Sequence, residues 1–235
     1  MKSLWLFFGF FLLLTVSAAD AQCPGSAGSI TLFGPVTGAP FSADYVHVFD
    51  SIEHDGSRRH QEAHGAVYRD SEGRARCDVK NLKTGTIRLA IVRDPVAGLT
   101  IAMNPEKQTA VVTHHSQPFA PLQKAATNAG AETRPQGNTP RQEELPSRVI
   151  EGFTVTGTRL VNTTSTGQTA TMEDWYSPDL KFKLFATLNN PAGNMSDKLI
   201  NIHLGDPDGS VFKVPEGYTV RNLYCHGHVC NYESE

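Results

Sequence analysis

The sequence predicts a mainly β protein, folded as a curved antiparallel sheet or half-barrel of hairpins with few short helices and interrupted by a flexible central loop. Two observations support this prediction. Apolar and polar residues alternate with a period of two, which is typical of strands with one buried and one wet face. Turn signals such as His54-Asp55-Gly56 separate these runs at short intervals.

The first block of strands is predicted within residues 22–115. Tyr45, His47 and Phe49 alternate on one face of its first strand, which ends at the turn at residues 54–56. The returning strands are predicted at 58–69, 74–80, 87–92, 99–103 and in a run that starts at Val111. Short turns join them, so the block is expected to be a meander of hairpins.

Residues 116–146 differ in composition from the strand blocks. Five prolines lie among Ala, Gln, Asn, Thr and Gly, with few large apolar side chains. Such a segment buries too little surface to offset the entropy lost on ordering it. We therefore predict a flexible linker or loop, in which only residues 119–131 favour a short helix.

A second block of strands is predicted within residues 147–221. Its strands are expected at 148–150, 153–161, 169–176, 180–184 and, as the last full strand, 199–204, after which a turn at 206–209 leads into 211–215. Residues 222–235 follow as a tail that carries Cys225, Cys230 and two histidines. The two blocks are interpreted as the two halves of one β domain.

The first 21 residues have the pattern of a signal peptide. Lys2 precedes the apolar run Leu4 to Val16, and Ala19-Asp20-Ala21 resembles a cleavage site. The run is shorter than the roughly 20 apolar residues that cross a membrane, although a retained N-terminal anchor is the alternative. We expect export to the periplasm or the exterior, with no transmembrane segment in the mature chain.

Charge and cysteine content narrow the class of protein further. The net charge is −3, and removing residues 1–21 takes away one Lys and one Asp, so it stays −3. This balance does not favour nucleic acid as a partner. Four cysteines in an oxidising compartment indicate disulfides, with three possible pairings. Cys225–Cys230 and Cys23–Cys77 are the pairings that we favour.

Several segments together resemble a large group of uncharacterised exported bacterial proteins. The matching segments are Gly65–Arg76, Arg93–Gly98, Asn104-Pro105, Ile150–Gly152, Gly157–Arg159, Glu173–Leu180, Asp206-Pro207 and Phe212–Pro215. The hairpin order also resembles the LolA/LppX type of fold, that of outer-membrane lipoprotein carriers. That resemblance implies a curved sheet around an apolar cavity for lipid or lipoprotein acyl chains.

Two groups of side chains are candidates for a site. Tyr68, Trp175, Tyr176 and Phe182 are candidates for lining a ligand cavity, although aromatic residues in strands are more often core residues. A second candidate consists of His60, Glu62 and His64, which share one face of a strand and form a known divalent-metal ligand set. The alternative for this set is an ordinary wet strand face.

The tail offers a third candidate. Cys225-His226-Gly227-His228-Val229-Cys230 contains four possible zinc ligands. Zinc sites usually combine ligand pairs from two separate places, and export favours oxidation of the cysteines. A disulfide loop with exposed histidines is therefore favoured over a metal site.

The sequence contains no nucleophile elbow, Walker loop or dinucleotide fingerprint. The leading hypothesis is a non-catalytic exported β protein that binds an apolar ligand or an envelope protein, and no cofactor is expected. One alternative is a secreted structural or protein-interaction module. Another is a metal-dependent hydrolase built on His60, Glu62 and His64.

Overall fold

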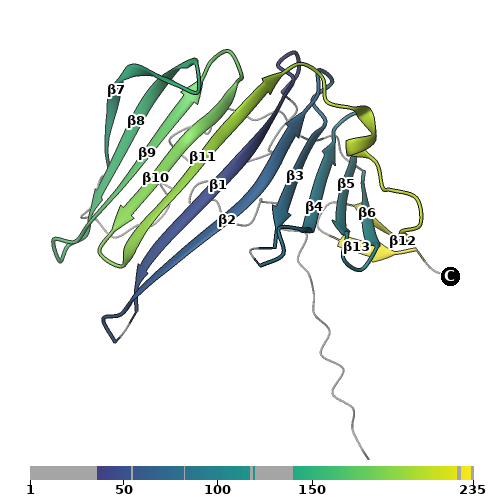
Figure 1. Ribbon diagram of the computed structural model, residues 1–235, viewed down its shortest axis with the longest axis horizontal. Helices are drawn as coiled ribbons and strands as arrows, with labels where there is room; N and C mark the ends of the chain where they lie inside the picture. Colours follow the sequence, from purple (N-terminus) through teal and green to yellow (C-terminus); the bar gives the residue numbers. More distant parts are fainter. Residues whose placement is uncertain are drawn as a thin grey trace, which may run out of the picture.

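The computed structural model describes residues 36–53, 55–81, 83–116, 119, 140–226 and 229–233. These residues form one thirteen-stranded sheet and a single short 3-10 helix (Figure 1). The predicted mainly β fold class is therefore confirmed. The predicted signal peptide at 1–21, Cys23 and the weak helix at 119–131, apart from Phe119, lie outside the described residues.

The elements follow one another along the chain as shown in Figure 1. They are β1 (Phe41–Ile52), β2 (Arg58–Arg69), β3 (Ala75–Lys80), β4 (Ile87–Asp94), β5 (Leu99–Asn104), β6 (Thr109–His115), β7 (Arg141–Ile150), β8 (Phe153–Thr163), β9 (Thr169–Ser177), β10 (Phe182–Asn190), β11 (Gly193–Leu204), η1 (Gly209–Phe212), β12 (Thr219–His226) and β13 (Val229–Tyr232).

Two meanders make up the sheet, and β1 joins them. The spatial order is β13-β12-β6-β5-β4-β3-β2-β1-β11-β10-β9-β8-β7. Strand β1 therefore pairs with its sequence neighbour β2 on one side and with the distant β11 on the other. All of these pairs are antiparallel except β6 with β12, which is parallel. The long β1, β2 and β11 form the middle of the sheet (Figure 1).

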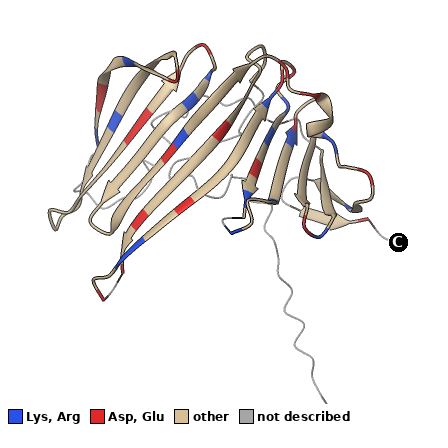
Figure 2. Cartoon of the chain, viewed as in Figure 1, with Lys and Arg blue, Asp and Glu red and all other residues tan. Residues whose placement is uncertain are grey.

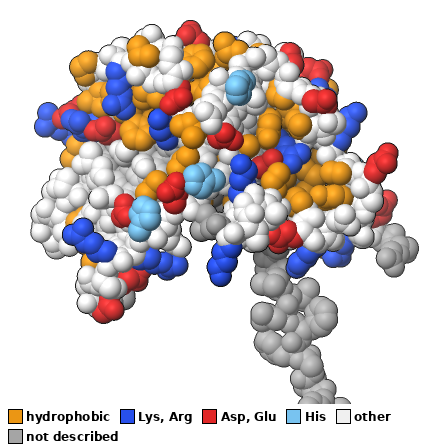
Figure 3. Space-filling model, viewed as in Figure 1, with side chains coloured by type: hydrophobic (Ala, Val, Ile, Leu, Met, Phe, Trp, Pro, Cys, Tyr) orange, Lys and Arg blue, Asp and Glu red, His pale blue; other side chains and the backbone are white. Residues whose placement is uncertain are grey.

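Hydrophobic cores lie on both faces of the sheet. The first core contains Phe41, Ala43, Tyr45, Val67, Ala75, Cys77, Val79, Val155, Trp175, Leu180, Phe182, Leu184 and Leu199. The second contains Ala90, Val92, Ile101, Met103, Ala110, Val112 and Phe212. Phe212 belongs to η1, so the segment between β11 and β12 covers the second core. Figure 3 shows hydrophobic side chains gathered on this part of the face in view.

A buried arginine fastens the two meanders together. Arg69, at the end of β2, is only 4% exposed. Its guanidinium donates hydrogen bonds to the carbonyl of Ala39 at 3.0 and 2.7 Å and to the carbonyl of Leu180 in the β9–β10 turn. It also lies over the rings of Phe41 and Phe182, 4.8 and 5.7 Å from their centroids. Burial lowers the pKa of Arg69 to about 10, so it remains a cation at neutral pH.

The structure differs from the expected segment boundaries at two places. Strand β7 begins at Arg141, so residues 141–146 of the expected linker are strand. This edge strand has mostly exposed side chains and therefore lacks the apolar alternation that predicts a strand. Its Pro146 lies where the register with β8 shifts, between Leu145 and Arg148, and an edge-strand bulge tolerates proline. Residues 222–226 and 229–232 of the expected tail are likewise strand, because β12 and β13 extend the sheet beyond β6.

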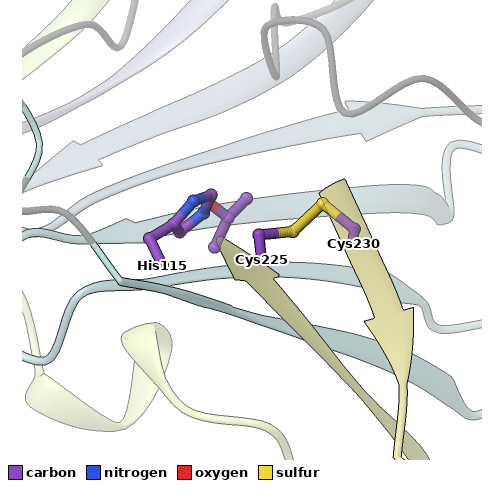
Figure 4. Close-up of a disulfide and its surroundings, with 4 residues drawn as sticks. His115, Cys225 and Cys230 are labelled. Carbon is purple, nitrogen blue, oxygen red and sulfur yellow. A yellow bond between two sulfur atoms is a disulfide. The ribbon is translucent and has the colours of Figure 1, made fainter. Parts of the chain in front are cut away.

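The predicted disulfide between Cys225 and Cys230 is confirmed. The two cysteines lie opposite each other on β12 and β13, and Cys225 also pairs with His115 of β6 (Figure 4). Cys77 is fully buried and is also disulfide-bonded. Its predicted partner, Cys23, lies outside the described residues. Over the described residues, no helix has the length and apolar character needed to cross a membrane.

We predict that Arg69→Met destabilises the fold by about 3 kcal/mol, because it leaves buried carbonyl oxygens without a donor. Urea unfolding followed by circular dichroism measures the loss. Arg141→Met is the matched control, since Arg141 is exposed and its ion pair with Glu143 lies at the sheet edge. The control is expected to change stability by less than about 0.5 kcal/mol. Equal losses in both variants would contradict the role given to Arg69.

Candidate functional site

A partly open hollow of about 680 Å³ lies on one face of the sheet, near the end where β1, β2, β3 and β4 meet the β3–β4 turn. Its lining residues are His47, Phe49, Gln61, Glu62, Ala63, Val79, Lys80, Asn81, Lys83 and Arg88. Small-molecule sites in proteins typically have volumes of about 300–1,000 Å³. The hollow is therefore large enough for a small ligand.

The floor of the hollow consists of side chains of β1 and β2 that point to the same face of the sheet. His47 is opposite Ala63, and Phe49 is opposite Gln61, in the antiparallel pair β1–β2. Opposite residues in a sheet point to the same face, as do residues two apart in one strand. The alternation at Tyr45, His47 and Phe49 predicted from the sequence is thus the alternation that forms this floor.

A buried polar pair stands at the inner side of the hollow. His47 and Asp197 are opposite each other across β1 and β11, and Nδ1 of His47 lies 2.8 Å from Oδ1 of Asp197. Both side chains are buried. A proton on Nδ1 donates to the carboxylate, which fixes the ring orientation and leaves Nε2 for another partner.

Tyr45 lies next to this pair and is 2% exposed. Its hydroxyl is buried and has no hydrogen-bond partner within the described part of the chain. Burial raises the pKa of Tyr45 to about 12, and the nearby carboxylates of Asp197 and Asp78 act in the same direction. The phenol therefore keeps its proton at neutral pH and remains a hydrogen-bond donor.

Gly65 makes room for the Tyr45 ring. The two residues are opposite each other in β1 and β2. A Cβ atom at position 65 would come within 2.0 Å of both the Tyr45 ring and the backbone oxygen of Asp78. The missing side chain thus leaves the space that the Tyr45 ring occupies against β2.

Three basic residues surround the outer part of the hollow. Lys80 ends β3, Lys83 lies in the following turn, and Arg88 lies in β4. Figure 2 shows basic segments at the lower end of β3 and in this turn. The β3–β4 register passes from Val79↔Leu89 to Lys80↔Ile87, which leaves Arg88 as the extra residue of a bulge. Bulges redirect side chains at sheet ends.

The aromatic residues predicted to line a cavity lie elsewhere. Trp175 and Phe182 are buried together in the first core. Tyr68 packs against the second core with Arg76 over its ring at 5.9 Å, and Tyr176 is 43% exposed. The structure therefore does not bring the four around one cavity, and none of them is among the residues that line the hollow.

The predicted metal ligands lie in one exposed strand segment of β2. His60 contacts Asp50 at 2.7 Å, whereas His64 contacts Glu62 at 2.8 Å. No cluster of three or more His, Cys, Asp or Glu side chains suited to a metal occurs among the described residues. In the C-terminal hairpin, Cys225 and Cys230 are bonded to each other and His228 lies outside the described residues.

Fold and hollow together define an open single-sheet β protein with a ligand-sized recess on one face. No protein-family model matches the chain, and no curated protein matches it. Solved structures do match it at the level of fold. The Pseudomonas aeruginosa MucA/MucB complex has 15% identity and a TM-score of 0.43 over 75% of this chain, and the chain spans only 56% of that protein.

Two further matches are to proteins of the LolA and LppX type. A LolA superfamily protein from Nitrosomonas europaea has 10% identity, a TM-score of 0.34 and coverage of 77% of this chain and 92% of its own. The Mycobacterium tuberculosis lipoprotein LppX has 10% identity, a TM-score of 0.33 and coverage of 74% and 89%. Both are similarities of fold at low sequence identity.

We predict that Gly65→Ala destabilises the protein by about 1–3 kcal/mol, because neither the Asp78 backbone nor the packed Tyr45 ring can yield easily. Gly209→Ala is the control, since a Cβ there meets nothing within 4 Å. Thermal unfolding of the two variants and the native protein makes the comparison. A Gly65→Ala protein as stable as the control would show that the ring is not held against β2.

Proposed function

We propose that this protein is an exported, non-catalytic binding protein of the cell envelope, which takes an apolar or amphipathic ligand into the hollow. The single observation that carries the proposal is the hollow itself, a recess of about 680 Å³ beside the first core. Phe49, Ala63 and Val79 give it an apolar wall, and His47 adds a convergent polar group. This combination is typical of small-molecule sites.

The chemistry of the hollow favours binding over catalysis. The described lining residues include no Ser, Thr or Cys that could act as a nucleophile beside His47. The Nδ1 atom of His47 is engaged with Asp197, which orients the ring. An oriented imidazole without a neighbouring nucleophile is suited to hydrogen bonding with a ligand.

We predict that the neutral fluorescent probe N-phenyl-naphthylamine binds the native protein and that Ala63→Phe weakens its binding at least about tenfold, because the larger side chain fills the recess. Ala102→Phe is the matched control, since Ala102 is an exposed residue of β5 that does not line the hollow. Fluorescence titration gives both dissociation constants.

Native mass spectrometry of protein purified from its source complements this titration. A bound apolar molecule that is retained by the native protein and lost from Ala63→Phe is the expected result. Absence of probe binding together with a ligand-free native protein would refute the proposed function.

A second candidate function, protein interaction, is favoured by the C-terminal hairpin. Val220, Tyr224, Val229 and Tyr232 are 38–63% exposed on β12 and β13. Under this alternative, Val229→Asp is expected to abolish a specific crosslink formed in intact cells, while Ala63→Phe leaves it unchanged. A crosslinking pattern that is the same for Val229→Asp and the native protein would exclude the hairpin as the contact surface.

A further inference from the structure

The residues around the hollow carry a local excess of positive charge, although the chain as a whole is slightly acidic. The whole chain has 21 basic and 24 acidic side chains and a net charge of −3. The lining of the hollow has three cations, Lys80, Lys83 and Arg88, against one carboxylate, that of Glu62. Three positive charges and one negative charge leave a local excess of two positive charges.

None of the three cations has an ion-pair partner among the residues that the structure describes. The carboxylate of Glu62 instead contacts Nε2 of His64 at 2.8 Å. Elsewhere in the described chain several half-buried cations are paired with carboxylates, as in Arg76 with Asp78 at 2.6 Å and Lys183 with Asp174 at 2.8 Å. The basic groups of the hollow are thus available to an anion from outside.

The geometry of the rim suits an acidic group on the ligand. Arg88 offers a planar fork of donors that matches a carboxylate or a phosphate, and the two lysines add mobile point charges. Their flexible side chains extend from the end of β3, the following turn and the β4 bulge, around one opening. The apolar wall at Phe49, Ala63 and Val79 lies in the same recess.

We propose that the hollow selects amphiphiles with an acidic headgroup, whose carboxylate or phosphate is bound by Lys80, Lys83 and Arg88 while the apolar chain lies along the wall of the recess. This inference rests on the proposed function and adds the headgroup class to it. His47 lies on the inner side of the same hollow, and its Nε2 atom is available for a hydrogen bond to the headgroup or to a polar group near it.

The experiment compares ligands of equal chain length in displacement of N-phenyl-naphthylamine. Decanoate and decyl phosphate are acidic, decanol is neutral and decyltrimethylammonium is cationic. For the native protein, the acidic ligands are expected to bind about tenfold more tightly than decanol, and added salt is expected to reduce this preference. Acetate and inorganic phosphate, which carry the charge without the chain, are expected not to displace the probe.

The variant that tests the assignment is Lys80→Gln with Lys83→Gln and Arg88→Gln. It is expected to bind decanol as the native protein does and to prefer decanoate by less than about threefold. The matched control changes the same number of charges elsewhere, at Arg141→Gln, Lys213→Gln and Arg221→Gln, which are exposed positions outside the hollow. This control is expected to keep the native preference.

Three other results would contradict one of the two proposals. Equal affinities for decanoate and decanol, or a preference that survives the triple variant, would overturn the headgroup assignment and leave the proposed function intact. Competition by acetate or inorganic phosphate as strong as that of decanoate would identify a site for a free anion and overturn the proposal for amphiphiles. Failure of the probe and all four chain ligands to bind would refute the proposed function itself.

Discussion

The pairing of β1 with both β2 and β11 is the constraint on which the rest of the structure depends. The six strands from β1 to β6 form one meander, and the five from β7 to β11 form another. The two are joined only where β1, the first strand of one, pairs with β11, the last strand of the other. Closing such a distant pair costs chain entropy, which favourable contacts must offset. The buried alternation of β1 and the hydrogen bonds of Arg69 to Ala39 and Leu180 provide these contacts at the junction.

The same junction brings the polar groups of the hollow together. Asp197 comes from β11 and His47 from β1, and they meet only because these strands pair in the observed register. A shift of one residue would turn His47 or Asp197 to the other face. The buried pair therefore also favours the observed register, because a shifted register would leave the buried carboxylate of Asp197 unpaired at a large cost in free energy.

The sequence predicts the parts of this fold that follow from local patterns. The alternation of Tyr45, His47 and Phe49 indicates correctly that they share a face, and the short turns indicate the hairpins. Only the end of strand β7, at residues 148–150, is predicted from the sequence, because the rest of this edge strand has mostly exposed side chains and no apolar period. The hollow was not predicted because its members meet through non-local register and through a bulge at Arg88, neither of which leaves a periodic signal. The sequence signal that could have located the hollow is the spacing of Lys80, Lys83 and Arg88 around the turn between β3 and β4.

The distribution of ion pairs distinguishes the hollow from the rest of the surface. His60 with Asp50 and His64 with Glu62 show that charged side chains at the exposed end of β2 contact one another, which accounts for them without a metal ion. Lys80, Lys83 and Arg88 have no such partners within the described chain. Exposed lysine and arginine side chains are well solvated, so their clustering adds little to the stability of the fold. Mutual repulsion among these three cations instead favours the binding of an anion. The apolar wall beside them offers a contact surface for an apolar chain attached to that anion.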